Sequence, residues 1–304
     1  MSPREERTEV PVEIDGHRLT LVNLEKVMYP RTGTTKAEVL DYYARVAPVL
    51  LPLLADRAVT RIRWPHGTGD QSFFEKNVPG GAPSWVRVVT VPTTGSRTRT
   101  GEEGELRFPV VDSLATLTWL ANLAALELHV HQWTVDADGD PVNPNRMVID
   151  LDPGEPAGLM ECSQVALLVR ERLAQLDLDC WPVTSGSKGL HLYADLAPEA
   201  PGGEPAQTSD EVRDLAKEIA EQLERENPKL VVSQMTKARR GGKVFLDWSQ
   251  NVGAKTTVSP YSLRGRELPT VAAPREWAEV AEGAEDPLGL EQLRFEEALA
   301  RLGV

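Results

Sequence analysis

The sequence contains little cysteine and no long hydrophobic run. Only Cys162 and Cys180 occur among 304 residues, and neither belongs to a CxxC pair, so we expect neither a disulfide framework nor a structural zinc site. No uninterrupted apolar stretch approaches the roughly 20 residues that cross a bilayer. The beginning of the chain, MSPREERTEV, is polar and charged rather than a secretory leader. The expected location is therefore the cytoplasm.

The chain also lacks an overall excess of basic charge. Its formal net charge is −13, which argues against a simple nucleic-acid coat protein because phosphate binding favours a basic surface. The segment from Arg225 to Arg266 differs, since its nine Lys or Arg and two acidic residues give a local charge of +7 and leave −20 for the remainder. This distribution favours a protein that grips a polyanion at one place. Chance clustering on a solvated face is the alternative.

Helical and extended patterns alternate along the sequence. Capping boxes that begin at Thr35 and Thr208 predict a helix from about Lys36 toward Leu54 and a second one after Thr208. Apolar spacing predicts further helices over 113–128 and 165–176 and near the C-terminus, strands over 57–64, 126–135, 147–151, 181–184, 190–194, 230–232 and 243–248, and loops over 93–105 and 195–207. This interleaving indicates the α/β or α+β class.

Three carboxylates form the strongest chemical pattern. Asp150 and Asp152 have the i, i+2 spacing of a strand, so their side chains project from one face and repel unless a cation lies between them. Asp247 lies within the apolar strand VFLDW. Together they predict a site for two hard divalent cations in phosphoryl transfer. The alternatives are a turn that Asp152 opens, a surface position for Asp150, and a structural salt bridge for Asp247.

A glycine-rich turn, SGSKGLH, follows the apolar strand that ends at Thr184. Its glycines allow close approach of a ligand to the backbone, and Ser185, Lys188 and His191 offer groups for a phosphate. The turn is not a Walker loop, and by itself the pattern favours an ordinary hairpin turn over a phosphate site.

Basic and aromatic residues add a weaker indication of nucleic-acid binding. Phe73 and Phe74 adjoin a Gly/Pro-containing loop and could stack on bases, or one of them could belong to the core. Basic residues that suit phosphate contact surround Asp247, namely Lys237, Arg239, Arg240, Lys243, Lys255, Arg264 and Arg266.

These motifs together resemble the polymerase domain of bacterial ATP-dependent DNA ligase D, in the archaeo-eukaryotic primase superfamily. The matches run in the family's order from about Asn23 to Pro274: NLEKVMYP, TKAEVLDYY, RIRWPHG, FFEKNVP, LELHVHQW, VIDLDPGE, PVTSGSKGLHLY, MTKARRGGKVFLDWSQN and KTTVSPYSLRGR. The resemblance implies a two-lobed primase-like fold with an RRM-like catalytic sheet. We expect a single primase-polymerase domain, with an N-terminal lobe over about 1–125, a catalytic core over 126–270 and a tail over 271–304.

The resemblance also implies residue roles. Asp150, Asp152 and Asp247 would be catalytic and hold the metals. The nucleotide would contact His129, Ser185, Lys188, His191, Arg240, Gln250 and Arg264. The DNA end would contact Asn23, Lys26 and Lys36 at its 5′-phosphate, and Phe73 and Phe74 by stacking.

The implied activity is template-directed addition of NTPs or dNTPs at DNA gaps and breaks during non-homologous end joining. Two ions, Mn²⁺ or Mg²⁺, would serve as cofactors, and Ku and a DNA ligase would be partners of this nucleoid-associated protein. Since no ligase or nuclease module is recognisable after Leu268, sealing is expected from another protein.

Two other classes of function are weaker interpretations. A non-catalytic module that binds 5′-phosphate DNA ends would keep the lysines and aromatic pair without needing all three carboxylates. A metal-dependent phosphoesterase would need the metals but no triphosphate pocket.

Overall fold

The polypeptide divides into two units that alternate along the sequence. Unit 1 comprises Met1–His129, Ser262–Thr270 and Arg294–Val304, and unit 2 comprises Val130–Tyr261 and Val271–Leu293. The computed structural model describes residues 8–93, 104–196, 199–200, 204–205 and 207–304. The sequence predicts lobes made of consecutive segments, whereas unit 1 also includes Ser262–Thr270 and Arg294–Val304.

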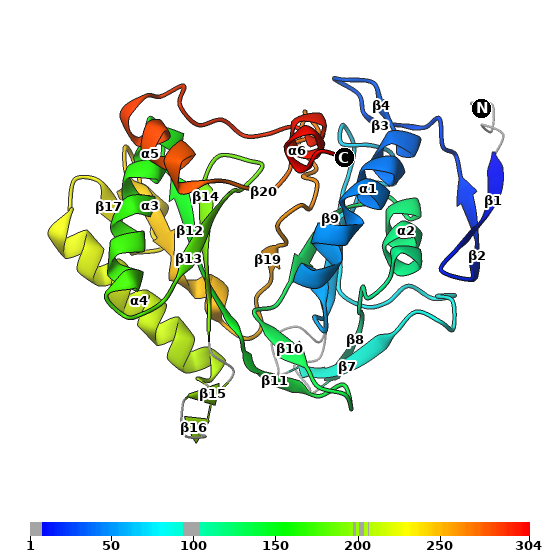
Figure 1. Cartoon of the computed structure of the whole chain (residues 1–304), viewed down its shortest axis with the longest axis horizontal. Coiled ribbons are helices and arrows are strands. Elements are labelled where there is room, and N and C mark those ends of the chain that lie inside the picture. Colours follow the sequence, from blue (N-terminus) through cyan, green and yellow to red (C-terminus); the bar gives the residue numbers. More distant parts are fainter. Residues whose placement is uncertain (1–7, 94–103, 197–198, 201–203, 206) are drawn as a thin grey trace. The chain divides into compact units, whose positions relative to one another are not determined.

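Unit 1 contains three helices and nine strands within its described residues (Figure 1). Their bounds are β1 Glu9–Ile14, β2 His17–Val22, β3 Val27–Tyr29, β4 Thr34–Thr35, α1 Lys36–Leu54, β5 Val59–Arg63, β6 Phe73–Glu75, β7 Val88–Thr93, β8 Gly104–Pro109, α2 Leu114–Asn122, β9 Ala125–Val130, whose last residue belongs to unit 2, and α6 Phe295–Leu302. Strands β9, β5 and β6 are neighbours in one sheet.

Unit 2 carries the remaining elements. Their bounds are β10 Trp133–Val135, β11 Pro141–Pro144, β12 Arg146–Pro153, α3 Leu159–Ala174, β13 Cys180–Thr184, β14 Leu190–Asp195, β15 Glu199–Ala200, β16 Glu204–Pro205, α4 Ser209–Glu226, β17 Val231–Val232, η1 Lys237–Arg239, β18 Val244–Asp247, η2 Trp248–Asn251, β19 Thr257–Val258, β20 Ala273–Pro274 and α5 Trp277–Glu285. A six-stranded sheet has the order β17-β18-β12-β14-β13-β20.

Helices α3 and α4 cover one face of this sheet (Figure 1). Alternate residues of β12, namely Met147, Ile149 and Leu151, are at most 1% exposed and pack against these helices. Each such side chain contributes about 1.5–3 kcal/mol through burial. The residues between them face the other side of the sheet. Burial of one set therefore fixes the direction of Asp150 and Asp152.

Most predicted elements are confirmed. Helix α1 spans Lys36–Leu54, and helix α4 begins at Ser209 after its capping residue Thr208. The predicted strands over 147–151, 181–184, 190–194, 230–232 and 243–248 correspond to β12, β13, β14, β17 and β18. The mixed helix and sheet class is confirmed.

The predicted helix over 113–128 is too long. Helix α2 ends at Asn122, and the chain passes into β9 at Ala125. Ala124 adopts a left-handed φ of 63°, which terminates the helix before strand pairing begins. Apolar periodicity could not separate the buried strand from a buried helix, because both present continuous apolar residues.

Two predicted loops cannot be compared fully. Residues 94–103 of the loop over 93–105 lie outside the described residues. Within 195–207, the described part contains the short paired strands β15 and β16. Across the described residues, no helix has the length and apolarity needed to span a bilayer.

Candidate active site

Three carboxylates lie on the sheet face that α3 and α4 do not cover. Asp150 of β12 is paired in register with Asp247 of β18 on one side and with His191 of β14 on the other. Asp152 lies two residues further along β12 and projects from the same face as Asp150. Antiparallel pairing thus brings the DLD and FLD segments together, as the carboxylate pattern predicted.

The mutual repulsion of these carboxylates is visible at Asp152. Although half of its side chain is exposed, displacement of water by the surrounding protein raises its pKa, and the charges of Asp150 and Asp247 raise it further, to about 6. His191 and Arg240 oppose this effect. A bound cation would stabilise the ionised form of carboxylates that lie this close together.

The donor set fits a hard divalent cation, because all three side chains offer carboxylate oxygens. The side chains as they stand do not form a coordination sphere: within the described part of the chain, no group of three or more His, Cys, Asp or Glu is arranged to hold a metal ion. The amide of Gln250 lies against both strands, with Nε2 at 3.0 Å from Asp247 Oδ2 and 3.4 Å from Asp150 Oδ2. These contacts occupy one oxygen of each carboxylate.

Asp247 is also held through its other oxygen. Its Oδ1 accepts the Ser249 backbone N–H at 3.0 Å and the Ser249 hydroxyl, which in turn accepts from the Lys255 ammonium. Lys255 is one of the basic residues that surround Asp247 in the sequence, whereas Ser249 carries no sequence signal of this contact. These contacts fix the orientation of the carboxylate at the end of β18.

Arg240 lies between the Phe245 ring and the Asp152 carboxylate. Its guanidinium lies 3.7 Å from the ring centroid of Phe245, and its Nη1 lies 3.9 Å from Asp152 Oδ2. The backbone of Arg240 packs so closely on Gly154 that a Cβ there would meet the Arg240 carbonyl oxygen at 2.1 Å. The glycine after Asp152-Pro153 therefore permits this close approach.

The glycine-rich turn joins β13 to β14. The Ser185 hydroxyl accepts the backbone N–H groups of Ser187 and Gly189, each at 3.2 Å, so this side chain shapes the turn. A Cβ on Gly189 would meet the Leu151 carbonyl oxygen at 2.0 Å. This explains why a glycine is needed where the turn crosses β12.

Gln292 closes the same turn and was not identified from the sequence. Its Oε1 accepts the Gly186 N–H at 2.6 Å, and its Nε2 donates to the Gly189 carbonyl at 2.9 Å. A lone glutamine far along the chain carries no sequence signal of this role.

His191 and Lys188 occupy contrasting positions. His191 is 4% exposed, its Nε2 lies 3.3 Å from Asp150 Oδ1, and its buried Nδ1 has no hydrogen-bond partner in the described part of the chain. Lys188 is exposed at the tip of the turn and pairs with Glu155 at 3.1 Å. The nucleotide-binding roles of Ser185, Lys188 and His191 stay predictions.

In unit 1, His129 and Arg264 meet at a buried carboxylate. Glu127 Oε2 lies 2.7 Å from His129 Nε2, and Glu127 Oε1 lies 3.3 Å from Arg264 Nε. The segment that carries Arg264 is tied to β9, since the Leu128 N–H donates to the Ser262 hydroxyl at 2.9 Å. Such long-range bonds explain why Ser262–Thr270 joins unit 1 instead of following the expected boundary at 270.

The predicted 5′-phosphate contacts gather at the start of α1. The Lys36 N–H donates to the Lys26 carbonyl at 2.8 Å, and the Lys26 N–H donates to the Asn23 carbonyl at 3.1 Å. Asn23 has a left-handed φ of 53°, which turns the chain there. The Lys36 side chain is buried and its ammonium donates to the Val22 carbonyl at 2.7 Å. The backbone thus brings the three residues together, and their contact with DNA stays a prediction.

The aromatic pair is exposed rather than buried. Phe73 is 43% and Phe74 58% exposed on β6. The next residue, Glu75, accepts from buried Arg61 at 2.6 Å and from Arg63 at 2.8 Å, which fixes β6 against β5. The core alternative for these phenylalanines is wrong, and base stacking stays a prediction.

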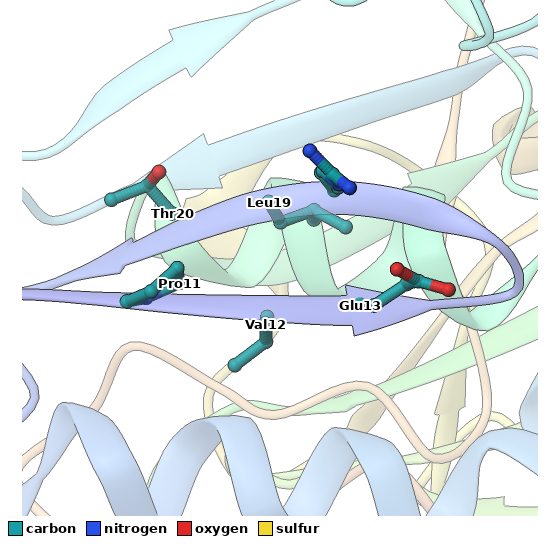
Figure 2. A pocket seen from close by; sticks show the side chains of 6 residues that line it. Pro11, Val12, Glu13, Leu19 and Thr20 are labelled. Carbon is teal, nitrogen blue, oxygen red and sulfur yellow. The ribbon is translucent and has the colours of Figure 1, made fainter.

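A hollow of about 470 Å³ lies elsewhere in unit 1. Figure 2 shows its lining on the β1–β2 hairpin, which consists of Pro11, Val12, Glu13, Arg18, Leu19 and Thr20. None of the predicted site residues lines this hollow.

Comparisons with known proteins identify relatives of this chain. The family described as "LigD, primase-polymerase domain" matches residues 35–303. The multifunctional non-homologous end joining protein LigD of Mycolicibacterium smegmatis is 49% identical over 285 residues, which cover 94% of this chain and 35% of that protein. The bifunctional LigD of Bacillus subtilis is 35% identical over 263 residues, covering 86% and 39% respectively. The chain therefore spans little more than a third of the length of these relatives.

A solved structure supports the fold. The polymerase domain from Mycobacterium tuberculosis ligase D, solved in complex with DNA, matches with a TM-score of 0.84 and 47% sequence identity over 94% of each chain. The primase-like fold predicted from the sequence is confirmed by this match.

Proposed function

Because the chain belongs to the LigD primase-polymerase domain family, we propose that it is a template-directed nucleotidyltransferase that adds NTPs or dNTPs at DNA gaps and breaks in non-homologous end joining. The observation that carries this proposal is the register of Asp150 with Asp247, with Asp152 on the same sheet face. Two segments distant in sequence supply the acidic oxygens that nucleotidyl transfer requires.

The three carboxylates are the proposed metal ligands, and neighbouring residues orient them. Asp150, Asp152 and Asp247 would hold two divalent cations, Mn²⁺ or Mg²⁺, which when bound would neutralise phosphate charge and favour attack by the primer 3′ hydroxyl. Ser249 and Lys255 orient Asp247, and His191 adjoins Asp150.

Residues that carry basic, imidazole, amide or hydroxyl groups would bind the triphosphate and sugar. We assign this role to His129, Ser185, Lys188, His191, Arg240, Gln250 and Arg264. Lys188 and Arg240 have acidic partners, Glu155 and Asp152, and an incoming phosphate could replace these partners.

DNA ends are the proposed polymeric substrate. Lys26 and Lys36, with Asn23, would contact the 5′-phosphate, and the exposed Phe73 and Phe74 would stack on bases. Ku would recruit the protein to breaks at the nucleoid in the cytoplasm. A DNA ligase activity would then seal the product.

The decisive experiment is extension of a gapped, 5′-phosphorylated duplex with NTPs or dNTPs, in Mn²⁺ or Mg²⁺. We expect Asp150→Asn and Asp247→Asn to lose extension by at least about 100-fold, because each removes one anionic ligand from the reacting centre. Binding of the same DNA, measured by fluorescence anisotropy, should remain close to wild type.

The exposed Asp214, which pairs with Arg213 on α4, provides the matched control. Asp214→Asn should extend normally. Wild-type protein that binds the DNA but never extends it would favour a DNA-end-binding module, and normal extension by Asp150→Asn would refute the carboxylate assignment.

A further inference from the structure

Glu127 is a buried carboxylate to which the sequence analysis gave no role. Its side chain is 5% exposed, and those of His129 and Arg264 are 14% and 11% exposed. Oε2 lies 2.7 Å from His129 Nε2, while Oε1 lies 3.3 Å from Arg264 Nε and accepts the Gly265 N–H at 2.9 Å. One carboxylate therefore contacts both nucleotide-binding candidates of unit 1.

The charge of Glu127 is stabilised by these contacts. Burial raises its pKa, but the hydrogen bond with His129, the charges of Arg264 and His129, and the Gly265 N–H together lower the pKa to about 2. The group is thus an anion at neutral pH. A buried anion that hydrogen-bonds to His129 and Gly265 and forms an ion pair with Arg264 favours one position for each of these groups.

An ionised carboxylate only accepts hydrogen bonds, which constrains its partners. His129 must therefore present an N–H at Nε2 to Glu127, and this hydrogen bond fixes the plane of the ring. The same carboxylate attracts the Arg264 guanidinium as an ion pair, with Nε 3.3 Å from Oε1. Orientation of both groups follows from one side chain.

The backbones that carry these groups are held by other bonds. The Leu263 N–H donates to the Tyr43 hydroxyl at 3.2 Å, and that hydroxyl donates to the Leu126 carbonyl at 2.6 Å. The Tyr29 hydroxyl donates to the Arg264 carbonyl at 2.9 Å. Loss of the Glu127 charge would therefore disturb side-chain orientation before it disturbs the path of the chain.

We infer that Glu127 is a positioning residue for nucleotide binding, which acts by orienting His129 and Arg264. This inference rests on the proposed function, since it assumes that these two residues contact the incoming nucleotide. Glu127 itself makes no contact with the reacting atoms in this role. Substitution of Glu127 should therefore change the KM for the nucleotide and leave kcat nearly unchanged.

The substitution Glu127→Gln tests this role with minimal change of shape. The amide keeps one acceptor but directs its NH2 toward a donor, either His129 Nε2–H or the Gly265 N–H. We expect the KM for the nucleotide to rise about tenfold, with kcat changed less than about twofold. Affinity for 5′-phosphorylated gapped DNA should not change.

A double-mutant cycle separates positioning from general stability. His129→Ala and Arg264→Ala should each raise the KM, and in the combined His129→Ala/Arg264→Ala background Glu127→Gln should raise it no further. Where extension is too slow, the nucleotide Kd measured by calorimetry on the DNA complex replaces KM. Should Glu127→Gln not fold, Glu127→Asp retracts the carboxylate by one methylene and should also raise KM.

Leu120→Ala serves as the stability control, because Leu120 is fully buried in α2 and its apolar side chain can neither donate nor accept a hydrogen bond. It should lower the melting temperature without changing KM. A wild-type KM in Glu127→Gln, while His129→Ala and Arg264→Ala raise it, would overturn the role of Glu127 alone. Unchanged KM in His129→Ala and Arg264→Ala would instead overturn the nucleotide assignments of the proposed function.

Discussion

At the scale of single residues, the acidic side chains of the two units respond to opposite surroundings. Asp152 is partly desolvated and lies among other carboxylates, so its pKa rises to about 6, whereas Glu127 lies among donors and positive charge and its pKa falls to about 2. The first arrangement holds charge that a cation can neutralise. The second is already neutralised by protein groups and is suited to hold them in place.

Glu127 should make the protein sensitive to acid. Its pKa is about 2 in the folded chain against an ordinary 4.5, so its stabilising contribution is complete above about pH 4.5 and disappears as pH falls through 2. The full contribution is about 3 kcal/mol. Urea unfolding of wild type and Glu127→Gln between pH 7 and pH 3 should give a difference in unfolding free energy that shrinks toward low pH.

The difference between wild type and Leu120→Ala should stay constant over the same range, because no charge is removed there. A Glu127→Gln difference that does not vary with pH would contradict the charge-based account.

At the scale of elements, two helices begin with the same device. In α1 the Thr35 hydroxyl accepts the Glu38 N–H at 3.3 Å while Glu38 accepts the Thr35 N–H at 2.7 Å, and Thr208 with Glu211 repeats both distances in α4. The functional surroundings differ. Lys36 is the first residue of α1, next to its capping residue, whereas the first turn of α4 carries only acidic charged groups, Asp210 and Glu211.

These matched caps allow a paired prediction. Thr35→Ala and Thr208→Ala should each lower the free energy of unfolding by about 1 kcal/mol. Only Thr35→Ala should weaken binding of 5′-phosphorylated DNA, because fraying of the first turn of α1 displaces Lys36. Chemical denaturation and DNA titration of both variants check this. Equal DNA affinity in the two variants would argue against a phosphate contact at the start of α1.

At the scale of the whole molecule, charge distribution decides how DNA can bind. A net charge of −13 opposes general attraction to a polyanion, so affinity depends on a small number of basic contacts. Each phosphate contact releases counterions and adds to the salt dependence of binding.

The salt dependence of DNA binding should therefore report individual lysines. Lys26→Ala should weaken binding to 5′-phosphorylated gapped DNA and reduce the slope of log K against log salt by about 1. Lys217→Ala is the control, because Lys217 already pairs with Glu221 on α4. Anisotropy titrations at several salt concentrations measure both slopes. An unchanged slope in Lys26→Ala would show that Lys26 does not contact a phosphate.

Features that depend on nearby residues could be predicted from the sequence. The capping boxes at Thr35 and Thr208 predicted where α1 and α4 begin, and the i, i+2 spacing of Asp150 and Asp152 predicted that both project from one face of β12. Helix spacing, strand alternation and capping are properties of contiguous chain, so no tertiary information is needed.

Only the tertiary structure decided which distant residues meet. Gln292 closes the glycine-rich turn, Glu127 joins His129 to Arg264, and the segment from Ser262 to Thr270 belongs with β9. None of these pairings leaves a local pattern, because a single polar residue has the same sequence context whether it faces solvent or a partner far along the chain. Strand pairing and burial select the partner, and they arise from the packing of the whole unit.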